Sequence, residues 1–161
     1  MIDKLLIGSR VVLGLAAAFV LPGSAIAASV APPNYPFTLK GGGNLNKSPN
    51  IIWPCGWTFQ MQTTSSSGGT MSGGVGDTNT NCNWLTVQPS TWSATSATTG
   101  VFHGLDFRQN GAFFCFTAAD VPFTFMKSGN NVTSFFFNSV NFGSGCNFNA
   151  NLNTGAALTV T

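Results

Sequence analysis

The chain has very few charged residues and no glutamate. Charged residues make up 6% of its 161 residues. After residue 27, the charges are Lys40, Lys47, Arg108 and Lys127 against Asp77, Asp106 and Asp120, a net charge of +1. Nucleic acids and anionic membrane surfaces are bound through clustered Lys and Arg. We therefore expect no nucleic-acid partner.

Residues for acid–base or nucleophilic chemistry are also scarce. His103 is the only histidine, and it alternates with Val101, Leu105 and Phe107, which places it on an apolar strand face. An odd separation puts His103 and Asp106 on opposite faces, so these two residues do not form a dyad. Asp106 and Arg108 share a face, which predicts a surface ion pair. We expect a protein that is not an enzyme and that uses no cofactor or metal.

No segment has the i, i+3, i+4, i+7 spacing of an amphipathic helix. Apolar residues instead recur at every second position, between turns rich in Gly, Ser and Asn. The clearest sets are Cys55, Trp57, Phe59, Met61; Val101, His103, Leu105, Phe107; Val121, Phe123, Phe125; and Cys146, Phe148, Ala150, Leu152. This pattern predicts an all-β fold, a single antiparallel β-sandwich or a partly open barrel.

The N-terminal region has the features of a secretory signal. Lys4 and Arg10 precede the 11-residue apolar run "VVLGLAAAFVL", and the small residues Ala25-Ile26-Ala27 follow it. The run is shorter than the roughly 20 residues that span a bilayer, and no second one follows, so we expect no integral membrane span. The expected organisation is a signal peptide (1–27), a Pro/Gly-rich arm (28–50) and the β-sandwich domain (51–161). The expected location is extracellular, with the periplasm as the alternative.

The arm contains one strand-like stretch, "YPFTLK", tethered by three consecutive glycines, Gly41 to Gly43. A tethered strand whose apolar residues are Tyr35, Phe37 and Leu39 can pair with a neighbouring molecule and build an open-ended fibre. The alternative is that the arm covers an edge of its own sheet.

Four cysteines, Cys55, Cys82, Cys115 and Cys146, are an even number for an exported chain. Their separations of 27, 33 and 31 residues lack the close pairs typical of zinc sites. "CNWLTV" follows Cys82 much as "CNFNANL" follows Cys146, which indicates two structurally similar halves. Of the three possible connectivities, this echo favours Cys55 with Cys82 and Cys115 with Cys146.

Two surface features indicate possible partners. Phe135, Phe136 and Phe137 cannot all face one side of a strand, so either the strand is covered on both faces or bulged, or an exposed phenylalanine there engages a hydrophobic substrate or another copy of the chain. Asn147, Asn149, Asn151 and Asn153 form a polar, uncharged strand face suited to sugars, to stacked β-assemblies, or simply to water. A carbohydrate-binding module is favoured if Trp57, Trp84 or Trp92 forms an exposed platform.

Several stretches together resemble a known family. They are "WPCGWTF", "TWSATSATTG" and the ending "FGSGCNFNANLNTGAALTVT". From about Pro54 onwards the chain resembles the PraB family of secreted bacterial proteins, named as protein activators of alkane oxidation. The resemblance implies a secreted, non-catalytic accessory protein acting at cell-surface or hydrophobic interfaces, in alkane utilisation or the biofilm matrix. A carbohydrate-binding module and a self-assembling fibre subunit are the alternatives.

Overall fold

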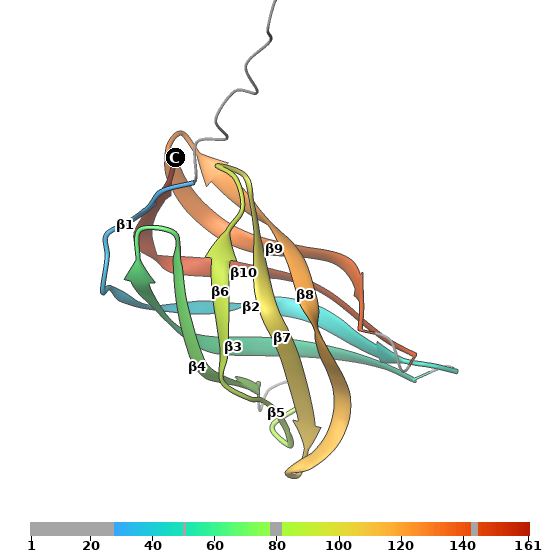
Figure 1. Cartoon of the computed structure of the whole chain (residues 1–161). Coiled ribbons are helices and arrows are strands. Elements are labelled where there is room, and N and C mark those ends of the chain that lie inside the picture. The colour runs from blue at the N-terminus through green and yellow to red at the C-terminus, as the bar shows by residue number, and fades with distance from the viewer. Residues whose placement is uncertain (1–27, 50, 78–81, 143–144) are drawn as a thin grey trace, which may run out of the picture.

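The computed structural model describes residues 28–49, 51–77, 82–142 and 145–161, which form ten strands (Figure 1). The strands are β1 (Val30–Ala31), β2 (Pro36–Lys47), β3 (Ile51–Ser65), β4 (Gly68–Gly76), β5 (Leu85–Val87), β6 (Ser90–Ala94), β7 (Thr99–Gln109), β8 (Ala112–Ser128), β9 (Asn131–Asn141) and β10 (Cys146–Val160). The expected all-β class is confirmed. The expected signal peptide, residues 1–27, lies outside the described residues. In the described segments, no helix is long and apolar enough to cross a membrane.

The strands form one antiparallel sheet that closes on itself. Their order is β1-β10-β2-β3-β4-β5-β7-β8-β9, and β9 also pairs with β10. The short strands β5 and β6 both lie between β4 and β7, so the closed wall has eight strand positions. The expected sandwich is therefore wrong, and the fold is a closed barrel. Period-two alternation gives one buried face per strand in both architectures, so it does not distinguish them.

The segment expected to be an arm, residues 28–50, contributes a strand to the barrel wall. β2 pairs with β10 along one edge and with β3 along the other. Phe37 and Leu39 are buried in the core. The short strand β1 pairs with the end of β10. The barrel therefore begins before residue 51, and both edges of β2 are occupied within its own chain.

The glycine triplet lies inside β2 and does not act as a tether. A Cβ on Gly41 would lie 2.1 Å from the backbone oxygen of Asn151, and one on Gly43 would lie 2.4 Å from the Cβ of Ala150. Glycine in a strand often marks such a close approach of another backbone. Composition alone suggests a flexible link here, but the close contact with β10 is what requires glycine.

Aromatic side chains fill the barrel. Three of the four predicted apolar sets point inward, those beginning at Cys55, Val121 and Cys146. The ring of Trp57 meets Phe107 and Phe148 edge-on, at centroid distances of 5.3 and 5.7 Å. Such edge-to-face contacts add to the stabilisation from buried area. Trp57 and Trp92 are 1% and 2% exposed, so neither forms a sugar-binding platform.

The fourth predicted set is wrong in part because the pairing of β7 with β8 contains a bulge at Gly104, where two residues of β8, Ala118 and Ala119, lie opposite one residue of β7. Gly104 has φ 84°, and the pairing with β8 shifts between His103 and Leu105. Leu105 and Phe107 face the core, as expected. Before the bulge the inward residue is Phe102, so His103 faces outward. One extra residue in a bulged strand reverses which side chains face the core.

The disulfides are Cys55–Cys82 and Cys115–Cys146, the pairing that the internal echo favours. The first ties β3 to the segment that precedes β5, and the second ties β8 to the first residue of β10. Because β9 lies between β8 and β10 in the sheet, the second bond spans an intervening strand. The two similar halves stay a prediction.

Candidate functional site

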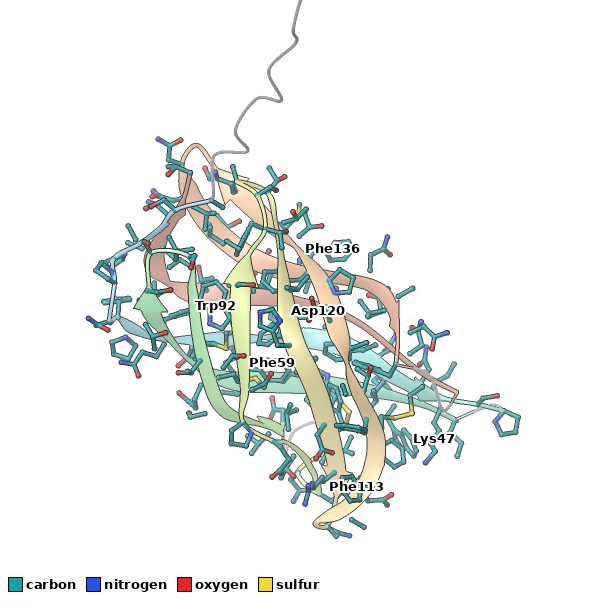
Figure 2. All side chains as sticks on the ribbon, in the orientation of Figure 1. Lys47, Phe59, Trp92, Phe113, Asp120 and Phe136 are labelled. Atoms are coloured by element: carbon teal, nitrogen blue, oxygen red, sulfur yellow. A yellow bond between two sulfur atoms is a disulfide. The ribbon has the colours of Figure 1, made fainter. Side chains whose placement is uncertain are left out.

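Apolar side chains, four of them exposed and three half-buried, lie on the β2–β3 and β7–β8 hairpins and just before β5, in a region that we call the aromatic end. Its members are Ile51, Ile52 and Trp53 at the start of β3, Trp84 just before β5, and Phe113, Phe114 and Phe116 near the start of β8. Phe113 is 72% exposed, Ile52 63% and Phe116 49%. Figure 2 shows Phe113 near the tip of the β7–β8 hairpin and Lys47 near the tip of the β2–β3 hairpin.

The β7–β8 hairpin presents its phenylalanines through a tight turn and a bulge. Asn110 and Gly111 have φ angles of 49° and 83°, as in the two-residue turns that join paired strands. Cys115 pairs with Phe107, but Arg108 pairs with Phe113, so Phe114 is the extra residue of a bulge. Phe113 and Phe116 then lie together on the outer surface, with ring centroids 6.4 Å apart.

On the outer surface, Arg108 lies over one of these two rings. Its guanidinium carbon lies 4.5 Å from the centroid of the Phe113 ring. Its Nε and Nη2 each lie 2.9 Å from Oδ2 of Asp106, which confirms the predicted ion pair. Arg108 therefore lies over the Phe113 ring and also pairs with Asp106. The carboxylate of Asp106 largely balances the positive charge of Arg108.

The half-buried aromatic residues form a second cluster, which we call the mouth cluster: Trp53, Trp84 and Phe114. The ring of Trp53 lies 4.7 Å from Phe114 and 5.6 Å from Trp84, both edge-on. The Nζ of Lys47 lies 4.3 Å from the Phe114 centroid and donates a hydrogen bond to the Phe114 carbonyl oxygen at 3.1 Å. The β2–β3 and β7–β8 hairpins therefore meet through Lys47, Trp53 and Phe114.

Both disulfides attach directly to this end. Cys115 follows Phe114, and its partner Cys146 lies opposite Lys47 in the pairing of β10 with β2. Cys55 is two residues from Trp53. The exposed aromatic residues thus sit on covalently cross-linked strands, so little conformational freedom is lost when they contact a partner.

Comparison with known families decides the identity. The family model described as "Alkane oxidation protein activator PraA/PraB-like" matches residues 5–161. The chain belongs to the PraA/PraB family. The resemblance seen from about Pro54 onwards is confirmed, and the match extends it to nearly the whole chain. No match was found among curated proteins or among solved structures.

In this PraA/PraB-like protein, the phenylalanines predicted as a partner surface lie mostly in the core. Phe135 and Phe137 are fully buried, and only Phe136 faces outward, where it is partly exposed. Of the three residues proposed for an assembly arm, Phe37 and Leu39 are buried within their own barrel and Tyr35 is 38% exposed. These six residues are not brought together into one apolar surface.

The predicted asparagine face is present on β10. Asn147, Asn149, Asn151 and Asn153 alternate with buried residues and point outward. Asn147 Nδ2 donates to the Ser139 carbonyl oxygen at 2.9 Å, and Asn149 Nδ2 donates to Ser139 Oγ at 3.4 Å. The face therefore continues onto β9 as a neutral, hydrogen-bonding surface.

His103 takes part in a hydrogen-bonded chain that sequence spacing did not indicate. Its Nδ1 lies 2.8 Å from Oδ1 of Asp120, and its Nε2 lies 2.9 Å from Oγ of Ser93. The order Ser–His–Asp is that of serine hydrolases. Here the side chains of His103 and Asp120 are 44% and 60% exposed, on the outer face of neighbouring strands. Across the described segments, no cluster of three or more His, Cys, Asp or Glu residues is placed to hold a metal ion.

Sequence reasoning also missed the aromatic end, although one signal for it was available. Cys115 has to face inward to reach Cys146, so the alternation of a strand predicts that its neighbour Phe116 points away from the core. The bulge that turns Phe113 to the same surface as Phe116 has no comparable signal.

Proposed function

We propose that this protein is an exported accessory factor of alkane use that contacts hydrocarbon through its aromatic end and catalyses no reaction itself. The observation that carries the proposal is the exposure of Phe113 and Phe116 on the β7–β8 hairpin and of Ile51 and Ile52 on the β2–β3 hairpin, two hairpins that meet through Trp53 and Phe114. Exposed apolar groups that gather at one place typically mark an interaction surface. The family description names an activator of alkane oxidation, which supports an alkane as the hydrophobic partner.

Export is supported by the two disulfides, which form and persist in oxidising compartments. Contact of the aromatic end with hydrocarbon is supported by the low charge of the chain, because few charges there oppose the approach to an oil surface. A protein that carries aromatic side chains to the oil–water boundary on a rigid barrel can hold cells or enzymes close to hydrocarbon without performing chemistry.

The test is the partition of the mature chain, residues 28–161, onto droplets of n-hexadecane. Transfer of both phenyl rings from water into hydrocarbon is worth roughly 2 to 4 kcal/mol, given their partial exposure. We therefore expect the double variant Phe113→Ser/Phe116→Ser to bind droplets at least about 30-fold more weakly than the natural sequence.

The matched control is Tyr35→Ser/Met126→Ser, which removes two exposed apolar side chains outside the aromatic end. It should bind droplets as the natural chain does. Unfolding by urea checks that both double variants stay folded. The proposal fails if the two double variants lose binding equally, or if the natural chain does not bind the droplets.

A further inference from the structure

A hollow beside Lys47 combines a cation with apolar walls. It has a volume of about 310 Å³ and lies near the tip of the β2–β3 hairpin. Its lining includes Lys47, Ile51, Ile52 and Gly145. Ile51 lies directly opposite Lys47 in the strand pairing, so the two side chains leave the hairpin on the same face.

The positive charge of Lys47 is not balanced by a carboxylate. In the described part of the chain, the ion pairs are Arg108–Asp106 and His103–Asp120. Lys47 instead donates to the carbonyl oxygen of Phe114 and lies over its ring. An ammonium group has three N–H donors, so this arrangement leaves donors available for an anion while the aromatic contact holds the side chain in place.

We propose that this hollow binds the carboxylate headgroup of a long-chain carboxylic acid, with the headgroup on Lys47 and the alkyl chain along Ile51 and Ile52 toward the hydrocarbon phase. Charge complementarity selects an anion, and the apolar walls select one that carries an alkyl chain. The inference rests on the proposed function, because it concerns the same end of the barrel at an oil surface.

The chemistry of alkane oxidation makes such a ligand available at the right place. Oxidation of a terminal carbon gives an alcohol, then an aldehyde and then a carboxylate, and a long-chain carboxylate collects at the boundary between oil and water. A protein with an aromatic end and a partly exposed cation would therefore bind more strongly to droplets on which this product has formed than to fresh alkane.

The experiment compares three kinds of n-hexadecane droplet at low ionic strength and pH 8: bare droplets, droplets carrying oleate, and droplets carrying an equal density of oleyl alcohol. Oleate and oleyl alcohol differ in headgroup charge but share the chain. We expect the natural protein to bind oleate droplets about twofold to fivefold more tightly than oleyl alcohol droplets, the range for one partly exposed ion pair. Raised salt should remove the difference.

Variants assign the effect to Lys47. Lys47→Gln should bind oleate and oleyl alcohol droplets equally, and Lys47→Arg should keep the preference for oleate. The matched control is Lys40→Gln, which has the same net charge as Lys47→Gln and lies seven residues away on β2, roughly 23 Å along the strand. It should keep the full preference.

Equal binding of the natural protein to oleate and oleyl alcohol droplets overturns the inference, and this comparison requires no variant. Equal losses in Lys40→Gln and Lys47→Gln also overturn it, because they indicate a general effect of net charge. Bare droplets separate the two proposals. Binding to bare droplets without a preference for oleate refutes the Lys47 site alone, and a preference for oleate without binding to bare droplets refutes the proposed function alone.

Discussion

Two stretches of similar sequence, "FFCF" at residues 113–116 and "FFF" at residues 135–137, have opposite environments in this barrel. In the second stretch Phe135 and Phe137 are fully buried, and only the middle ring faces outward. In the first stretch Phe113 and Phe116 are 72% and 49% exposed. A phenylalanine cluster therefore indicates a core or a surface according to where the strand register places it.

The pairing partners explain the difference. Around Phe135 to Phe137 the register with β10 is regular, so the rings alternate between the core and the outside. Around Phe113 to Phe116 a bulge adds one residue opposite β7, and the Asn110-Gly111 turn ends the hairpin two residues earlier. A bulge near a hairpin tip redirects side chains that strict alternation would bury.

The largest expected effect is the loss of folding stability when a phenylalanine of the buried stretch 135–137 is removed. Phe135→Ala removes a fully buried ring that stacks on Phe123 at a centroid distance of 4.7 Å. We expect the free energy of unfolding to fall by about 3 to 5 kcal/mol, the range for a phenylalanine deleted from a core. Phe113→Ala should change it by no more than about 0.5 kcal/mol, because that ring is mostly in water. Urea unfolding followed by tryptophan fluorescence measures both.

The contrast between the buried stretch 135–137 and the exposed stretch 113–116 is refuted if the two substitutions destabilise the protein by similar amounts. Hydrocarbon binding gives the converse readout. Phe113→Ala should weaken droplet binding, and a correctly folded Phe135 variant with a similar volume, Phe135→Leu, should leave it unchanged.

A smaller loss of folding stability is expected when the disulfide Cys115–Cys146, whose Cys115 lies within the exposed stretch 113–116, is removed. The double variant Cys115→Ser/Cys146→Ser opens a loop of 31 residues, and loops of this length are worth about 3.7 kcal/mol in the chain-entropy treatment. The variant should unfold at a lower urea concentration than the natural protein. Because Cys115 lies between Phe114 and Phe116, it should also bind hexadecane droplets less tightly under conditions where it stays folded.

Removing the other bond, Cys55–Cys82, is the matched comparison, since it closes a similar loop of 27 residues on the opposite side of the mouth cluster. Unchanged urea midpoints in both double variants would contradict a stabilising role for the disulfides. A loss of droplet binding that is the same for both pairs would show that the aromatic end responds to stability and not to local support at Phe114.

Much of this fold follows from local patterns. Alternation identified β3, β10 and parts of β7 and β8, and the echo around the cysteines gave the disulfide pairing, because both features depend on neighbouring residues. Closure of the barrel depends on β10, which pairs with β9 on one side and with β2 on the other. β2 lies about a hundred residues earlier in the sequence, and no local pattern encodes that pairing. Gly41 and Gly43 were misleading for the same reason, since what they accommodate is a strand far away in the sequence.

The candidate site was harder to predict than the fold. The asparagine face follows from simple alternation on β10 and was found correctly. The aromatic end depends on one bulge in β8 and on two hairpins that meet only in three dimensions, through Lys47, Trp53 and Phe114. The pairing of His103 with Asp120 likewise depends on the Gly104 bulge.

The smallest expected effect concerns that histidine. His103→Ala removes an exposed side chain and one exposed ion pair, so stability should change by no more than about 0.5 kcal/mol. Catalysis by a Ser–His–Asp arrangement depends strongly on hydrogen-bond donors aimed at the developing oxyanion in a site that excludes water. Ser93 instead lies in register with Gly68 on one side and Val101 on the other, within the sheet ladder. Hexadecane binding should be the same in His103→Ala as in the natural protein.

A serine-directed fluorophosphonate tests the same arrangement directly, with peptide mass spectrometry to locate the label. We expect Ser93 to react no faster than Ser96, an exposed-loop serine that hydrogen-bonds Thr99 and not a histidine. Selective labelling of Ser93 that disappears in both His103→Ala and Asp120→Asn would contradict the non-catalytic role, because a merely structural hydrogen bond would not activate the hydroxyl group. Equal, slow labelling of both serines would support the non-catalytic role. The function would then rest on the exposed phenylalanines of the aromatic end and not on His103.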